Sequence, residues 1–147
     1  MTAEKYFEMS NRLHELIISD KLEIDYLNEL LKFSNDSEIK SRIEELEDSI
    51  YNEMEQYVSM LKIIRDVINK IEDIDEKLVL KYRYILHYSF RQISNKMKLS
   101  NRQLGRIHIA GLKHANKVLK EGGIYAPKSI IERVKEENGG RNHTKIV

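Results

Sequence analysis

Apolar residues recur every three or four positions along the first half of the chain. The first series comprises Tyr6, Met9, Leu13, Ile17, Ile24, Leu27 and Leu31. The second series comprises Ile39, Ile43, Leu46, Ile50, Met54, Tyr57, Leu61, Ile64, Ile68 and Ile71. Because this spacing places side chains on one face of an α-helix, the pattern predicts two long amphipathic helices. Residues 33–37, which are mostly polar, separate the two series and form the predicted turn.

The two helices are expected to fold back on each other. Asp36 or Ser37 is placed to cap the start of the second helix. Since a short turn between amphipathic helices favours antiparallel packing, we predict an antiparallel coiled-coil hairpin over residues 1–74. Two successive steps of four around Ile50 resemble a stutter in the coiled-coil repeat.

Further apolar side chains lie beside the seam of this hairpin, and a contact between two helices leaves them uncovered. They are Leu16, Ile18, Leu30, Tyr51, Val58 and Val67. We therefore expect a second copy of the chain to cover them, which predicts a homodimer. The alternative is a monomer in which the hairpin packs on its own C-terminal domain.

Two capping boxes organise the second half of the chain. Ser89 is followed three residues later by Gln92, and Ser100 is followed in the same way by Gln103. A box of this kind marks the N-terminus of a helix. The two boxes are eleven residues apart, so they enclose one short helix and open a second one.

The helices that follow from these boxes have the spacing of a helix-turn-helix. We expect a short helix over about residues 90–97, a tight turn, and a longer helix over about residues 101–120. An apolar face predicts a preceding helix over about residues 76–87. We assign the helix-turn-helix domain to residues 75–121.

The composition supports an all-α fold. The first 104 residues contain neither Gly nor Pro, which disfavours β-hairpins and disordered linkers. The 147-residue chain has no Cys, which excludes disulfides, a thiol nucleophile and a Cys-based zinc site. No run approaches 18 consecutive apolar residues and the start does not resemble a signal peptide, so we expect a cytoplasmic protein that makes no contact with a membrane.

The net charge of +1 is the sum of an acidic first half and a basic second part of the chain. Residues 1–75 hold nine Lys and Arg against 19 Asp and Glu, whereas residues 76–120 hold eleven against a single acid, Glu76. A solvated helical face normally mixes both signs. The near absence of acids over 45 residues therefore indicates a surface that binds nucleic acid, joined to an acidic element that self-associates or binds a partner.

The basic segment carries side chains suited to DNA. The predicted DNA-binding residues are Arg91, Lys96, Lys98, Ser100, Asn101, Arg102, Gln103, Arg106 and Lys113. Those in the first turns of the longer helix can hydrogen-bond base edges in a major groove. The cations in or beside the shorter helix are placed to contact phosphates.

Two glycines fall inside the longer predicted helix, where each costs about 1 kcal/mol of helix stability. They are Gly105 and Gly111. We expect each to permit a close approach of the backbone, either to DNA or to the first helix of the motif.

Residues 83–94, which read RYILHYSFRQIS, resemble the Arg-Tyr-Leu-x-Gly-x-Ser-aromatic-x-x-Ile-Ala signature of sigma-70 region 4-like domains. His87 stands where that signature has Gly, Ser94 where it has Ala, and Lys98 where many helix-turn-helix turns have Gly. Together with the acidic N-terminal helices, the chain resembles a family of small phage and prophage proteins of Gram-positive bacteria that includes the ArpU and RinA-type regulators of late transcription.

This resemblance implies a regulator of phage or prophage genes that binds specific sequences in double-stranded DNA through the helix starting at Ser100. It also implies contact with RNA polymerase as a partner. Two alternatives remain. One is a DNA-packaging protein like the small terminases, and the other is a coiled-coil adaptor that does not bind DNA.

Enzymatic activity is not expected. The five His residues have no metal-binding spacing, and no glycine-rich loop is present that could hold a phosphate. We therefore predict no catalytic residue, no metal and no cofactor. Residues 122–147 form a C-terminal tail in which residues 128–137 have the pattern of a short helix.

Overall fold

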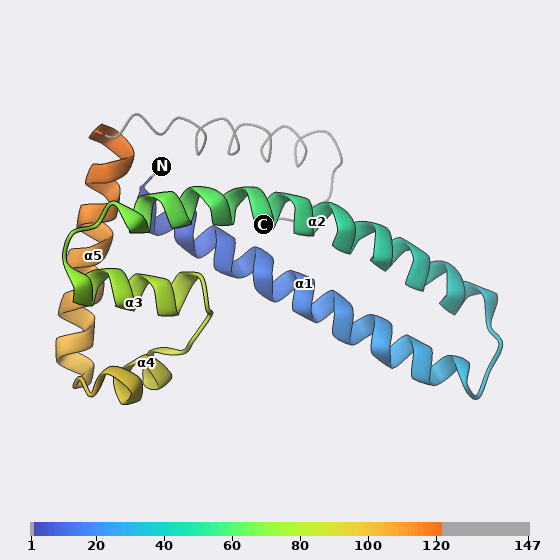
Figure 1. Ribbon diagram of the computed structural model, residues 1–147. Helices are drawn as coiled ribbons and strands as arrows, with labels where there is room; N and C mark the ends of the chain where they lie inside the picture. The colour runs from blue at the N-terminus through green and yellow to red at the C-terminus, as the bar shows by residue number, and fades with distance from the viewer. Residues whose placement is uncertain (1, 122–147) are drawn as a thin grey trace.

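The computed structural model describes residues 2–121 and consists, over these residues, of five α-helices with no strand (Figure 1). The helices are α1 (Ala3–Leu31), α2 (Ser37–Asn69), α3 (Ile74–Tyr84), α4 (Phe90–Met97) and α5 (Asn101–Glu121). The predicted all-α fold is confirmed. The short helix predicted within the tail lies outside the described residues.

Short polar side chains begin most of these helices by accepting hydrogen bonds from free backbone amides. Thr2 accepts from Lys5 at the start of α1, and Asp36 accepts from Glu38 and Ile39 at the start of α2. Of the two candidate caps for α2, Asp36 therefore takes that position. Asp73 caps α3 in the same manner.

Helices α1 and α2 run antiparallel beside each other for most of their length (Figure 1). Along α2 and just past its end, one row of buried or half-buried positions steps by three and four without interruption, and Ile63 and Ile68 are buried beside this row. The row consists of Ile43, Leu46, Ile50, Glu53, Tyr57, Met60, Ile64, Val67 and Ile71.

This register corrects the sequence interpretation. The predicted stutter is wrong, because Glu53 is 2% exposed whereas Met54, the expected seam residue, is 48% exposed. Met60 likewise takes the buried position in place of Leu61. A regular alternation of three and four keeps the seam of α2 turned toward one partner helix, and here it places a carboxylate in that seam.

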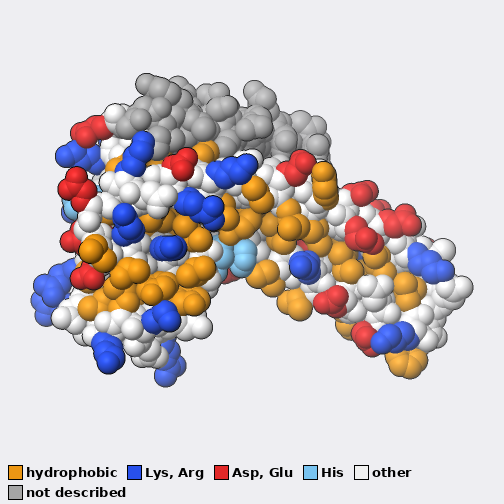
Figure 2. Space-filling model, in the orientation of Figure 1, with side chains coloured by type: hydrophobic (Ala, Val, Ile, Leu, Met, Phe, Trp, Pro, Cys, Tyr) orange, Lys and Arg blue, Asp and Glu red, His pale blue; other side chains and the backbone are white. Residues whose placement is uncertain are grey.

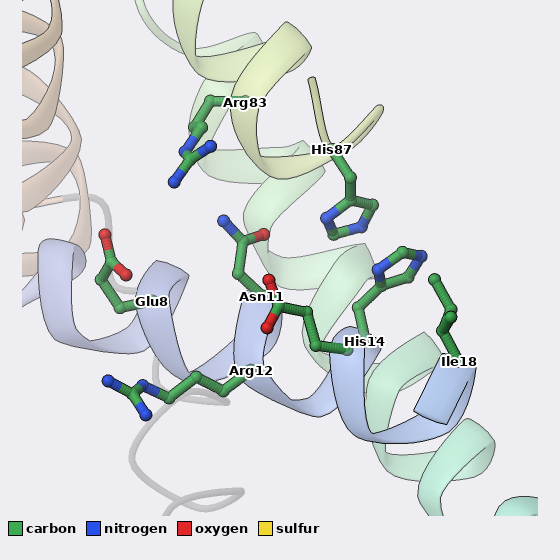
Figure 3. Close-up of a pocket in the computed structure, with 8 residues that line it drawn as sticks. Glu8, Asn11, Arg12, His14, Ile18, Arg83 and His87 are labelled. Atoms are coloured by element: carbon green, nitrogen blue, oxygen red, sulfur yellow. The ribbon is translucent and has the colours of Figure 1, made fainter. Parts of the chain in front are cut away.

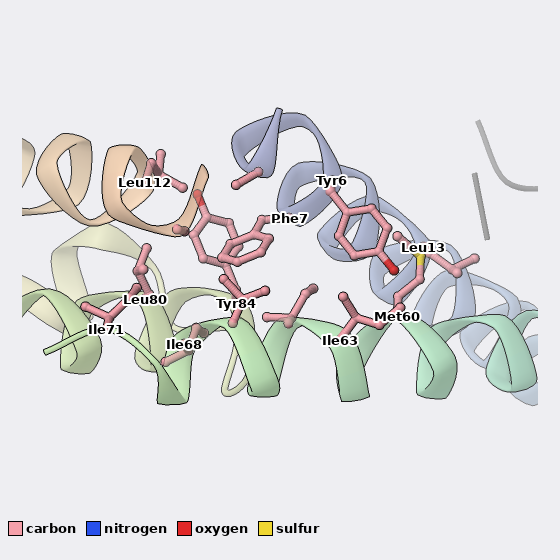
Figure 4. Packing of buried hydrophobic residues seen from close by; sticks show 14 of the residues in the cluster. Tyr6, Phe7, Leu13, Met60, Ile63, Ile68, Ile71, Leu80, Tyr84 and Leu112 are labelled. Carbon is pink, nitrogen blue, oxygen red and sulfur yellow. The ribbon is translucent and has the colours of Figure 1, made fainter. Parts of the chain in front are cut away.

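The main hydrophobic core joins the paired helices to α3 and α5 (Figure 4). Phe7 of α1 meets Tyr84 of α3 edge to face, with ring centroids 5.0 Å apart. Leu112 and Ala115 of α5 complete this core. At the N-terminus of α1, the backbone amide of Ala3 donates to the side chain of Asn116 on α5. Helices α3 and α5 are thus fixed on the end of the α1–α2 pair where α1 begins.

This packing covers some of the apolar side chains that lie beside the predicted hairpin seam. Val67 is fully buried in the main core, and Leu16 packs against it. Ile18, Tyr51 and Val58 remain exposed along the α1–α2 pair, where orange side chains reach the surface in Figure 2. None of the helices in residues 2–121 is long and apolar enough to span a membrane.

Candidate nucleic-acid interface

The region from α4 to α5 is a tight turn between two capped helices. The Ser89 hydroxyl accepts from the backbone of Gln92, and the Gln92 side chain accepts from the backbone of Ser89. Ser100 and Gln103 make the same reciprocal pair at the start of α5. Both predicted capping boxes are therefore present, and they fix where α4 and α5 begin.

The turn itself depends on a left-handed backbone conformation at Lys98, with φ 55° and ψ 46°. Its amide donates to the carbonyl of Ser94, and the Ser94 hydroxyl donates to the carbonyl of Leu99. The hydroxyl of Ser94 on α4 therefore stabilises the turn by a hydrogen bond across it. Ser94 stands where the sigma-70 region 4-like signature has Ala, and Lys98 stands where many helix-turn-helix turns have Gly.

A small second core holds α4 and α5 against α3. Ile93 of α4 and Val79 of α3 are fully buried, and Leu104 of α5 is almost so. Helix α5 also comes close to α3 at Gly111, where a Cβ atom would lie 3.3 Å from the side chain of Leu80. Among the described residues, no atom outside the adjoining helix backbone lies within 4 Å of the Cβ position at Gly105. Gly111 therefore serves helix packing, whereas the fold makes no such demand at Gly105.

All nine predicted DNA-binding side chains are exposed. Arg102, Arg106 and Lys113 share the outer face of α5, opposite its buried residues Leu104 and Leu112. Ser100, Asn101 and Gln103 surround the N-terminus of the same helix, and the oxygen of the Gln103 side chain is used by the capping box. Arg91 and Lys96 lie on α4, and Lys98 lies in the turn.

The one acid of the basic segment does not contribute to this surface. Glu76 is 8% exposed, and its carboxylate is hydrogen-bonded to Nδ1 of His114 on α5. Because residues 77–120 contain no Asp or Glu, the exposed charges of this segment are all positive. In Figure 2 the end of the molecule that carries α4 and the start of α5 shows blue Lys and Arg side chains without red ones, whereas the rest of this face shows both colours.

Sequence reasoning missed two residues of this face. Lys120 and Ile109 both lie on the outer side of α5 and are exposed. Counting residues around a helix from the buried Leu104 would have placed them there. Ile109 carries neither a charge nor a hydrogen-bonding side chain, so the signals that mark DNA-binding residues do not include it.

The loop between α3 and α4 is tied to the α1–α2 pair by three rings. The imidazole of His87 stacks on that of His14, and its Nε2 lies 2.5 Å from the hydroxyl of Tyr57. His87 also has a left-handed backbone, with φ 59°. Burial, together with the nearby His14 and Arg83, lowers the pKa of His87 to about 4. The unprotonated ring is therefore the form that holds the loop.

A cavity of about 430 Å³ opens beside these rings (Figure 3). Its charged lining is mixed, with Glu8, Glu15 and Arg12 from α1 and Arg83 from α3. Arg83 also donates to the carbonyl of Tyr88 and lies over the ring of Phe90. These contacts fix the entry into α4. Within residues 2–121, no cluster of three or more His, Asp or Glu side chains could hold a metal ion.

Comparison of the chain with known protein families, curated proteins and solved structures gave no match.

Proposed function

We propose that this protein is a sequence-specific DNA-binding regulator of phage or prophage transcription. In this proposal α4 and α5 act as the helix-turn-helix of a sigma region 4-like domain, and α5 enters the major groove with its N-terminal turns. Cytoplasmic DNA is the expected target. The paired helices α1 and α2 act as a coiled-coil hairpin that carries this domain.

The observation that carries the proposal is the uniform charge of the exposed face. The outer side of α5 presents Arg102, Arg106 and Lys113, and the single acid of the segment is buried under it. Phosphate contacts by Lys and Arg supply most of the affinity of a protein for DNA, whereas groups at the groove floor supply the sequence preference. Both kinds of side chain are available on one end of the molecule.

We further propose that the regulator acts as a homodimer. Exposed apolar side chains on both paired helices support this, among them Ile18, Tyr51 and Val58. A dimer with a two-fold axis would bind two half-sites arranged as a palindrome. Light scattering at micromolar concentration tests the point, and a monomer mass would contradict it.

Selection of bound duplexes from a random pool tests the function directly. We expect enrichment of one palindromic motif and a linear fall of log affinity with log salt, with a slope of about −0.9 per phosphate contacted. Binding to duplexes of every sequence alike would exclude a sequence-specific regulator. Absence of DNA binding would favour an adaptor whose basic half binds an acidic protein.

A further inference from the structure

The outer face of α5 carries one large apolar side chain among its cations. Among the described residues, Ile109 is the one large apolar side chain of this helix that is well exposed, at 56%. It follows Arg106 by three residues and precedes Lys113 by four, so it lies on the same face as both. The residues that pack α5 on the core, Leu104, Leu112 and Ala115, lie on the opposite side.

The fold gives no reason for an isoleucine at this position. Ile109 is in neither hydrophobic cluster, and a β-branched residue lowers helix propensity slightly. A single exposed apolar residue is ordinary on a protein surface. What distinguishes Ile109 is its position between two cations, on the helix face that carries the proposed DNA contacts.

The spacing of this face fits a helix that lies along a groove. Arg102, Arg106 and Ile109 are separated by four and then three residues, so they form one row along α5. At 1.5 Å per residue, Ile109 lies about 10 Å from Arg102 along the helix axis. This distance corresponds to about three base pairs of B-DNA.

Resting on the proposed function, we propose that Ile109 is a specificity-determining residue that packs on the C5 methyl group of a thymine in the major groove. That methyl group is the one apolar feature that a base pair presents there, and aliphatic side chains recognise it by contact. Arg102 and Arg106 would then read hydrogen-bonding base edges on the N-terminal side, while Ile109 reads a methyl group on the C-terminal side. The bound sequence is expected to contain a thymine at a fixed distance from the bases read by the arginines.

Thymine-to-uracil replacement in the selected duplex tests this contact, because uracil differs from thymine only by the missing methyl group. With the wild-type protein, we expect one position in each half-site where the replacement weakens binding about fourfold, the effect of one methyl group removed from an apolar contact. With Ile109→Ala, that position is expected to lose its sensitivity, so that thymine and uracil bind alike. Lys117→Ala is the matched control, because Lys117 is exposed further along α5 and is expected to keep the thymine preference.

The outcomes separate the inference from the function on which it rests. A selected duplex that tolerates uracil at every position, or a thymine preference that survives in Ile109→Ala, would overturn the inference and leave sequence-specific binding intact. A wild-type protein that selects no sequence would overturn both. Circular dichroism of Ile109→Ala is expected to match the wild type, since the side chain lies outside both cores.

Discussion

The imidazole of His87 lies parallel to that of His14, with ring centroids 3.5 Å apart and planes 7° from each other. The two residues are far apart in sequence, and they bring the loop before α4 onto α1. A left-handed backbone at a non-glycine residue costs about 1–2 kcal/mol. At His87 the ring stack and the hydrogen bond to Tyr57 offset this strain. A glycine would relieve the strain but would lose both contacts.

This relationship makes stability depend on pH. In the unfolded chain His87 takes up a proton near its ordinary pKa of 6.5, whereas in the folded protein burial lowers that pKa to about 4. Between these values the unfolded state binds more protons, so the free energy of unfolding is expected to fall as the pH decreases from about 7 to about 4. Burial lowers the pKa of His14 and His108 as well, which acts in the same direction.

Urea unfolding followed by circular dichroism at about pH 7.5 and about pH 5 measures this effect. His87→Asn is the informative variant, because Asn tolerates a left-handed backbone but does not titrate. It is expected to be less stable than the wild type at the higher pH and to lose less stability on acidification. An equal loss in both proteins would show that His87 is not a source of the pH dependence.

Lys98 is the second residue with a left-handed backbone, and here we expect a glycine substitution to stabilise the protein. Its side chain is exposed and, among the described residues, makes no contact that would be lost with glycine, while the backbone hydrogen bond of Lys98 to Ser94 would be kept. Lys98→Gly is therefore expected to raise the free energy of unfolding by about 0.5–1 kcal/mol, whereas His87→Gly is expected to lower it. Thermal unfolding of the two variants at neutral pH compares them directly. The same sign for both would contradict the account of His87.

Substitutions of the two glycines of α5 are also expected to change stability in opposite directions. Gly105→Ala is expected to stabilise the fold by about 0.5–1 kcal/mol, because alanine favours a helix and the added Cβ would not clash with any described residue. Gly111→Val is expected to destabilise it by about 1–3 kcal/mol, because added carbons would press on the buried Leu80. Denaturant unfolding provides the measurement. If Gly105→Ala stabilises the protein and yet weakens DNA binding, the backbone at Gly105 approaches the DNA closely.

Local signals in the sequence predicted the helices well. Asp36, Ser89 and Ser100 act on amides two or three residues away, so their capping roles can be read from short stretches of sequence. The starts of α2, α4 and α5 follow from them. The predicted helix over residues 76–87 instead ends at Tyr84, because His87 turns left-handed to reach the α1–α2 pair.

Features that depend on distant contacts could not be predicted in this way. The hydrophobic pattern favoured Met54 over Glu53 in the seam of α2, because hydrophobicity alone does not include the register imposed by α1. The same limit applies to Gly111, whose role depends on Leu80. For the candidate site, the sequence identified which side chains are exposed and basic, since charge and helical position are local properties. The DNA contact itself remains a prediction.

Some of the proposed DNA-binding residues read bases and others bind phosphates. Variants of the two groups are therefore expected to change DNA binding in different ways. Arg102→Ala and Arg106→Ala are each expected to weaken binding to the selected sequence by about 1–3 kcal/mol and to relax the preference at one base position. Lys96→Ala and Lys98→Ala are expected to weaken binding to every duplex alike and to reduce the steepness of the salt dependence by about one phosphate contact each. Lys62→Ala is the matched control, because this cation is exposed on α2, outside the basic segment, and its loss is expected to change neither property. Affinities for the selected and a scrambled duplex, measured over a range of salt concentrations, distinguish the two kinds. Identical behaviour of the arginine and lysine variants would mean that α5 does not read the bases.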